Sequence, residues 1–284
     1  MMLPATMKKG GLLAFLAAAL LTGCTAPKEP GLRIGLQLFT VRQDLSQDFE
    51  GTLQRVRDIG YEGVEFCNEF SGHSPAEVRQ ICDRLGLVIF SNQVPYQQML
   101  TDLDRVIEEN KALGVEYVTF PWMEVPLRPG VDPEKFRQTV ASLDEIGARL
   151  REAGLQLLYH NHDFEFALLP DGVSGWDCLF ASTDPADVQA ELDVCWADYA
   201  GADPVALLKA LARRVPVLHM KDYVRTERGI GFRPLGEGVM DLQTILAEAP
   251  AAGVRWLCVE QDAPAPGAAD RFEGPEISFR YLAE

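Results

Sequence analysis

Residues 110–120, "NKALGVEYVTF", decide the fold. A helix-like segment ends at Gly114, and a short apolar run follows it directly. Glycine just past a helix takes the left-handed conformation that other residues resist. Near-continuous apolar runs are typical of parallel strands that are buried on both faces. The arrangement recurs in four more segments: "VRDIGYEGVEF", "CDRLGLVIFSN", "REAGLQLLYH" and "PAAGVRWLCVE".

The repeat predicts a single α/β domain in which helices and parallel strands alternate. A helix is expected over 133–153, where apolar residues recur at helical spacing. Eight strand–helix units in about 250 residues are the usual size of a (β/α)₈, or TIM, barrel. An open doubly wound sheet would need a glycine-rich phosphate loop after its first strand, and "IGLQLFTVRQDL" has none. The glycine-rich segment 229–238, "GIGFRPLGEG", is interpreted as a flexible loop at the barrel top. The expected strands are 33–39, 63–66, 87–91, 117–121, 155–160, 188–193, 215–220 and 255–260.

The segment before residue 31 has the layout of an export signal. "MKKGGLLAFLAAALLTGC" places two lysines before an apolar run that is too short for a comfortable membrane span. Its end, Leu-Thr-Gly-Cys, resembles the bacterial lipobox, in which the cysteine becomes the acylated first residue. A plain secretory signal or an internal apolar helix are the alternatives. We expect a lipoprotein signal peptide over 1–23, a tether over 24–30 that starts at a lipidated Cys24, and the barrel over 31–284.

Charge and cysteine content limit the possible functions. The chain has a net charge of −16, and removal of residues 1–23 leaves 24 basic and 42 acidic residues, or −18. Because nucleic-acid binding depends on basic contacts, we expect no nucleic-acid partner. The five cysteines beyond Cys24 form no CxxC pair, so they predict no disulfide framework even though export permits disulfides.

Polar and aromatic residues gather at the expected carboxyl ends of the strands, where TIM barrels carry their chemistry. Three of the four histidines lie there, and His73 is the exception, with a surface role expected. Simpler interpretations exist: Glu65 could cap a helix, Asp193 could pair with an arginine, and Lys221 could be a solvated loop residue. The set in chain order is Gln37, Glu65, Asn92, Gln93, Trp122, Glu124, His160, His162, Glu165, Asp193, Trp196, His219, Lys221, Asp222, Glu260 and Asp262.

Four of these residues, Glu165, Asp193, His219 and Glu260, would converge at the top of one barrel. Three carboxylates so close would repel one another unless a cation neutralised them. Mixed oxygen and imidazole ligands suit Mn²⁺, Mg²⁺, Co²⁺ or Zn²⁺. The sequence therefore predicts one divalent metal ion.

Several motifs in order resemble the sugar phosphate isomerase/epimerase family with its xylose isomerase-like barrel. They are "IGLQLFTVR", "GYEGVEF", "YHNHDFEF", "ELDVCWADYAGADP", "VLHMKDY", "LGEGVMDL" and "CVEQD". The resemblance implies one divalent metal held by Glu165, Asp193, His219 and Glu260. In sugar 3-epimerase relatives the first ligand lies nearer the strand, about where Tyr159 or His160 stands, so His160 is the alternative to Glu165. Trp196 stands where those epimerases often have a histidine, so a different substrate pocket is expected.

The resemblance also implies a reaction. A metal that bridges a carbonyl and its neighbouring hydroxyl stabilises an enediolate, and a nearby carboxylate or histidine can remove the adjacent C–H proton. Returning the proton elsewhere gives isomerisation or epimerisation, which we favour; expelling a β-substituent gives a lyase. The expected catalytic residues are Glu260 as base, with Glu165, His160, His162 and Lys221. The expected substrate-binding residues are Gln37, Glu65, Trp122, Trp196 and Arg225.

The expected substrate is a small neutral carbohydrate: a sugar, a keto-sugar or a glycoside. Phosphate sites need backbone N–H nests or clustered basic residues, and the candidates near the rim, Lys221, Arg225, Arg228 and Arg233, share one loop region. An endonuclease of the same barrel type would need more histidines and a basic groove. A non-catalytic sugar-binding lipoprotein is the remaining alternative.

The signal interpretation predicts that Cys24→Ser stays unprocessed or loses membrane association. The lipid is the only membrane anchor that the sequence predicts, and fractionation of cells after the substitution measures it. Recovery of the unaltered protein in the soluble cytoplasmic fraction would refute export to the bacterial cell envelope.

Overall fold

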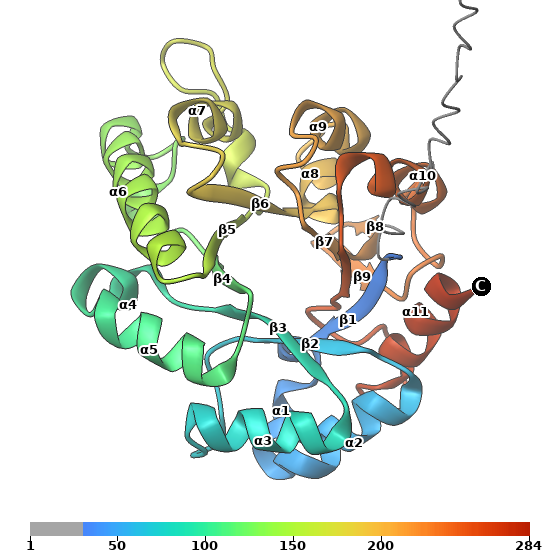
Figure 1. Cartoon of the computed structure of the whole chain (residues 1–284). Coiled ribbons are helices and arrows are strands. Elements are labelled where there is room, and N and C mark those ends of the chain that lie inside the picture. The colour runs from blue at the N-terminus through green and yellow to red at the C-terminus, as the bar shows by residue number, and fades with distance from the viewer. Residues whose placement is uncertain (1–30) are drawn as a thin grey trace, which may run out of the picture. The chain divides into compact units, whose positions relative to one another are not determined.

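The computed structural model describes residues 31–284; the expected signal peptide, Cys24 and the tether lie outside the described residues. Eight parallel strands close into a barrel with helices on its outside (Figure 1). The strand order around the barrel is β1-β10-β7-β6-β5-β4-β3-β2, so neighbours in sequence are neighbours in space. The strands are β1 (Arg33–Gln37), β2 (Gly63–Phe66), β3 (Val88–Gln93), β4 (Tyr117–Phe120), β5 (Gln156–His160), β6 (Val188–Asp193), β7 (Val217–Met220) and β10 (Trp256–Val259).

The helices between the strands begin and end at the residues that their sequences favour. Helix α3 has a reciprocal Ser74–Glu77 capping box and proline at its first turn. Gly114 follows α5 in the left-handed conformation, with φ of 76°, as the repeat predicted. The helices are α1 (Arg42–Gln47), α2 (Phe49–Ile59), α3 (Pro75–Leu85), α4 (Tyr96–Thr101), α5 (Leu103–Leu113), α6 (Pro133–Glu152), α7 (Gly175–Ser182), α8 (Val194–Tyr199), α9 (Pro204–Ala210), α10 (Leu242–Ala252) and α11 (Glu273–Ala283), with short 3-10 turns η1 (Leu38–Val41), η2 (Val125–Leu127) and η3 (Phe164–Phe166).

The barrel prediction is confirmed, and the expected strands differ only at their ends. The interpretation of 229–238 as a flexible loop is wrong. Its first half is β9 (Gly229–Arg233), which pairs with β8 (Asp222–Thr226) in an antiparallel hairpin. Its second half is fixed by Asp222, whose carboxylate accepts the backbone N–H groups of Gly236 and Gly238 at 3.0 Å. A side chain at Gly238 would collide with that carboxylate, so the glycine is required there.

The interior of the barrel is apolar at one end and polar at the other. Alternate strand residues share a face, so a single strand supplies both parts: Val217 and then His219 on β7, Leu158 and then His160 on β5. At the apolar end Phe90 stacks on Trp256 with ring centroids 4.3 Å apart. The apolar cluster consists of Phe90, Tyr117, Leu158, Val217, Trp256 and Cys258.

Gly63 leaves room for the apolar cluster, because a Cβ there would lie 2.7 Å from the Trp256 ring. The cluster therefore closes one end of the barrel and supports the polar residues above it.

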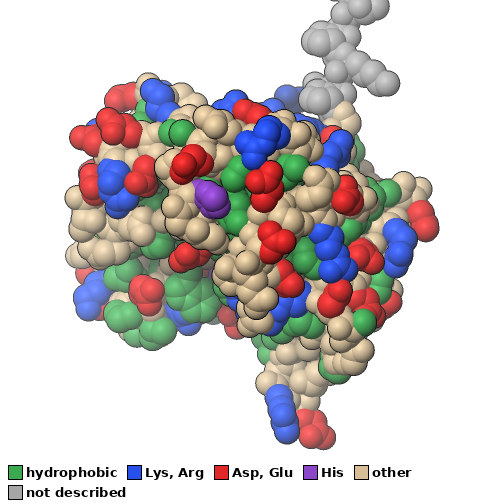
Figure 2. Space-filling model, turned by 90° about the horizontal axis from the view of Figure 1, so that it is seen from below, with side chains coloured by type: hydrophobic (Ala, Val, Ile, Leu, Met, Phe, Trp, Pro, Cys, Tyr) green, Lys and Arg blue, Asp and Glu red, His purple; other side chains and the backbone are tan. Residues whose placement is uncertain are grey.

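On the outer surface, acidic and basic side chains are interspersed with apolar ones on the face that Figure 2 shows. No helix of the described residues is long and apolar enough to cross a membrane. The five cysteines of the described residues are unpaired, and four of them are buried.

Candidate active site

A pocket of about 470 Å³ opens at the carboxyl ends of the strands. Eight residues expected from the sequence line it: Gln93, Trp122, His160, His162, Trp196, Lys221, Glu260 and Asp262. The pocket is also lined by residues to which no sequence pattern pointed: Phe39, Cys67, Arg128 and Phe164. Half of the sixteen expected rim residues therefore line one pocket.

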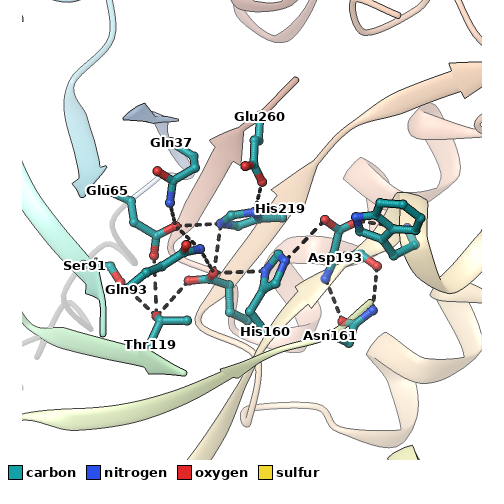
Figure 3. Close-up of polar contacts among 12 residues, drawn as sticks. Gln37, Glu65, Ser91, Gln93, Thr119, His160, Asn161, Asp193, His219 and Glu260 are labelled. Carbon is teal, nitrogen blue, oxygen red and sulfur yellow. Dashed lines mark hydrogen bonds and ion pairs between the residues drawn. The ribbon is translucent and has the colours of Figure 1, made fainter. Parts of the chain in front are cut away.

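His219, at the end of β7, lies at the centre of the buried polar contacts. Its Nδ1 is 3.0 Å from Glu260 Oε2, and its Nε2 is 2.8 Å from Glu65 Oε1 and 2.9 Å from Glu191 Oε1. Figure 3 shows the His219 ring between Glu260 on one side and Glu65 on the other. Burial opposes a charge on the ring, but Glu191 and the other acidic neighbours raise the pKa of His219 well above its usual value.

His160 lies beside His219 at the end of β5, with ring centroids 4.5 Å apart. Its Nε2 faces Asp193 Oδ2 at 3.9 Å, and its Nδ1 lies 3.2 Å from Glu191 Oε1. Burial, with a smaller contribution from His219, lowers the pKa of His160 well below its usual value, so this ring is neutral. The pair therefore combines one neutral and one charged imidazole.

One group of four buried residues could hold a metal ion. Each of His160, Asp193, His219 and Glu260 offers one ligand atom, and these atoms all lie within 4.8 Å of one another. Asp193 Oδ1 caps α8 by accepting the N–H of Trp196 at 2.9 Å, while Oδ2 has no hydrogen-bond partner in the described part of the chain. Asp193 Oδ2 is instead paired with the Lys221 ammonium, which lies 3.1 Å away where a cation would bind. Two nitrogens and two carboxylate oxygens are a ligand set that fits a divalent cation.

Glu165 lies outside this group. Its Oε1 accepts the Tyr159 hydroxyl at 2.7 Å and its Oε2 accepts the backbone N–H of His162 at 2.9 Å. The turn η3 places the Glu165 carboxylate against Tyr159 and the His162 backbone. The group that could hold a metal ion therefore contains His160, and not Glu165, beside Asp193, His219 and Glu260. Burial raises the pKa of Glu165 to about 7.

Lys221 is buried among three carboxylates, and two of them, Asp193 and Glu260, belong to the group that could hold a metal ion. Its Nζ lies 2.7 Å from Glu260 Oε2, 2.9 Å from Asp262 Oδ1 and 3.1 Å from Asp193 Oδ2. Burial disfavours the ammonium, but Asp193, Asp262 and Glu260 together raise the pKa of Lys221 well above its usual value. Burial raises the pKa of Asp262 to about 6. The Lys221 ammonium therefore compensates the charge of these carboxylates, and Lys221 is not a solvated loop residue.

A polar layer lies beneath the histidines. Gln37 and Glu65, expected to bind substrate, are fully buried there, and the Gln37 side-chain amide donates to Glu65 at 2.5 Å. Burial, with the Glu65 charge, raises the pKa of Glu191 to about 8. Burial also favours a higher pKa for Glu65, but the nearby His219 outweighs this effect and the pKa of Glu65 is lowered. Glu191 has no role in the sequence analysis, although it lies two residues before Asp193 on the same face of β6.

Aromatic rings form the pocket rim. His162 stacks on Phe164 with an interplanar angle of 4°, and Trp122 meets His162 edge-on at 4.6 Å. The Arg128 guanidinium lies 3.8 Å from the Phe164 ring centroid, and its Nε donates to the Met123 carbonyl. Arg225 does not line the pocket: it lies over Tyr199 and donates to that residue's carbonyl.

Comparison with known proteins finds the same architecture elsewhere. The family model for xylose isomerase-like TIM barrels matches residues 53–276. An inosose dehydratase from Lacticaseibacillus casei is 22% identical over 82% of this chain and 88% of its own length.

Among solved structures, a sugar phosphate isomerase/epimerase from Parabacteroides distasonis superposes with a TM-score of 0.74 at 25% identity, covering 92% of this chain and 96% of that one. An L-ribulose 3-epimerase has a TM-score of 0.67 at 17% identity, covering 89% and 94%.

The position of Glu165 predicts a pH-dependent effect of Glu165→Gln. The pKa of about 7 in the folded protein exceeds the unfolded value of about 4.3, so the native state binds more protons between these values and its stability falls as pH rises. Glutamine does not titrate. We expect the free energy of unfolding of the variant, relative to the unaltered protein, to increase between about pH 5 and pH 8 in urea denaturation. Exposed Glu145→Gln is the control, and parallel curves for Glu165→Gln would contradict the assignment.

Proposed function

Because the chain belongs to the xylose isomerase-like TIM barrel family, we propose that it is a divalent-metal-dependent enzyme that removes the proton next to a carbonyl in a neutral keto-sugar or glycoside. The observation that carries the proposal is the convergence of His160, Asp193, His219 and Glu260 beneath an aromatic pocket. The dehydratase and epimerase names of the relatives support chemistry on polyhydroxylated molecules. A binding protein without catalysis would not need this convergence of ionisable groups.

The metal proposal assigns His160 as the first ligand in place of Glu165, with Asp193, His219 and Glu260 as the others. When bound, the ion supplies a Lewis acid that draws electrons from a substrate carbonyl. Lys221 stays within reach of the same region, because Asp262 holds its ammonium independently of the four ligands.

Proton transfer is assigned to groups that face the pocket. Glu260 was the expected base, but its contacts with Lys221 and His219 outweigh burial and lower its pKa, which makes it a weak base. Asp262, with a pKa raised to about 6, is better matched to proton abstraction near neutral pH. His162 is neutral, because burial lowers its pKa, and its Nδ1 has no partner in the described residues. We assign Asp262 as base and His162 as the group that exchanges a proton with a substrate hydroxyl.

The pocket supports a neutral substrate. Lys221 is compensated by three carboxylates, and Arg128 is the other cation among the described residues that line the pocket. A single guanidinium beside aromatic rings suits hydroxyl groups and a sugar face. The arginines at 225, 228 and 233 do not line the pocket, so the clustered donors that a phosphate needs are missing from it.

The contacts of Glu165 support β-elimination over epimerisation. Epimerisation needs groups that exchange protons on both faces of the reacting carbon, and Glu165, one candidate, is bonded to Tyr159 and the His162 backbone. One base and one acid are enough to remove a proton and expel a hydroxyl or glycosyl group. The inosose dehydratase similarity over 82% of the chain favours the same outcome. Isomerisation or epimerisation is the second candidate, supported by the shared fold of the L-ribulose 3-epimerase.

The ligand assignment predicts which substitutions abolish metal binding. Asp193→Ala, His219→Ala and His160→Ala should each remove stoichiometric Mn²⁺ or Co²⁺ and the activity, because each deletes a ligand atom. Glu165→Gln should keep about one ion per chain. Isothermal titration and elemental analysis measure the occupancy, and circular dichroism checks the fold. Loss of the ion in Glu165→Gln with retention in His160→Ala would reverse the assignment.

The reaction proposal predicts products from a defined substrate panel in D₂O. Neutral 3-keto-glycosides and inososes should lose a β-substituent, with a dehydrated or cleaved product detected by NMR and mass spectrometry. Solvent deuterium in an otherwise intact sugar would instead establish the isomerase or epimerase. Turnover of sugar phosphates alone would refute the neutral substrate. Asp262→Asn should lower kcat by about 100-fold or more with the ion retained.

A further inference from the structure

We propose that Glu191 is a positioning residue that fixes both histidines of the site, because one of its carboxyl oxygens lies against Nδ1 of His160 and Nε2 of His219. The consequence for metal affinity rests on the proposed function, whereas the effect on the histidine rings does not.

Glu191 lies directly beneath the two rings. Its side chain is fully buried, and its Oε1 is 2.9 Å from His219 Nε2 and 3.2 Å from His160 Nδ1. Both contacts are short, but neither is aligned as a hydrogen bond in this conformation: His219 Nε2 bonds to Glu65, and His160 Nδ1 has no partner in the described residues. Its Oε2 accepts the Thr119 hydroxyl at 3.1 Å. One oxygen therefore faces both rings while the other is anchored to β4.

This contact decides which nitrogen of each ring faces the pocket. With Nδ1 of His160 and Nε2 of His219 turned down toward Glu191, the opposite nitrogens face Asp193 Oδ2 and Glu260 Oε2. The hydrogen bond on one ring nitrogen sets the tautomer and orients the other nitrogen for a metal. Glu65 forms the hydrogen bond with His219 Nε2, but of these two carboxyl groups Glu191 alone contacts both rings.

The position argues for a role in the site. A carboxyl group buried without water is unfavourable unless its neighbours compensate it, and an apolar residue of similar size would pack on this face. Polar groups from four strands instead surround the Glu191 carboxyl group: Gln93 on β3, Thr119 on β4, His160 on β5 and His219 on β7.

The test compares substitutions that leave different hydrogen-bond acceptors beside the two histidines. Glu191→Met removes the acceptor at similar size, and Glu191→Gln keeps a single neutral one. Glu65→Gln changes a contact with His219 alone. Ser91→Ala is the matched control, because Ser91 is buried in the same layer and bonds to Thr119 but contacts neither imidazole.

The first measurement is ¹⁵N NMR of histidine-labelled, metal-free protein. We expect neutral His160 to be the Nδ1–H tautomer in the unaltered protein and in Ser91→Ala. In Glu191→Met it should shift to the Nε2–H tautomer or a mixture, with His73 as an internal reference. An unchanged His160 tautomer in Glu191→Met would overturn the proposal. If that variant does not fold, the same comparison is made with Glu191→Gln, where replacement of the carboxyl group by an amide with a single acceptor oxygen should produce a partial shift.

The second measurement is the Mn²⁺ and Co²⁺ affinity by calorimetry, with the Co²⁺ visible spectrum. Affinity should fall about 10- to 100-fold in Glu191→Met, less in Glu191→Gln, and remain unchanged in Ser91→Ala. A lower melting temperature with an unchanged affinity and spectrum would assign Glu191 a structural role only. If the unaltered protein binds neither ion, the proposed function fails, and the tautomer measurement still decides the role of Glu191.

Discussion

Mutual compensation of charge at the top of the barrel is the constraint on which the rest of the site depends. Glu65, Glu191, Asp193 and Glu260 are almost completely removed from water, together with His219 and Lys221. An isolated carboxylate in such a place would be strongly destabilising, so each must be paired or protonated. His219 and Lys221 supply the positive charge, and the raised pKa of Glu191 lets the Glu65–Glu191 pair keep a proton. Each of these buried groups therefore depends on the others for compensation of its charge.

The barrel geometry brings this set together with little help from local structure. Parallel strands end at the same rim, and alternate residues face inward, so one residue on each strand can reach the axis. The apolar layer beneath, with Phe90 stacked on Trp256, keeps water out from below. Strand ends that carry histidine and carboxylate therefore become a buried site and not a solvated rim.

The sequence predicted the barrel because its signals are local: a glycine after each helix and an apolar run for each strand. It also pointed to the grouped residues, since they lie at strand ends: three were expected ligands, and His160 was the alternative to Glu165. Glu165 could not be placed, because a turn within five residues of His160 decides whether the side chain faces the pocket or Tyr159. The order of residues 236–240 was missed because the contacts of Asp222 that hold this segment are not local. Arg128 belongs to no periodic pattern, so its place in the pocket could not be predicted. Glu191 lies two residues before Asp193 on the same strand, and this spacing could have predicted that both side chains face the site.

Lys221 makes this site different from the metal sites of small domains that fold only when the metal binds. In those domains the ligands repel one another until the ion binds, so metal binding and folding are coupled. Here the ammonium already contacts Asp193 and Glu260, two of the proposed ligands, and Asp262 holds it from the side. The barrel top therefore does not depend on an ion for its charge balance. An incoming ion would share two carboxylate oxygens with the ammonium, so its affinity reflects that competition as well as the ligand geometry. The same ammonium would then lie next to the ion, where a substrate oxygen that gains negative charge on loss of the neighbouring proton would find a second positive group.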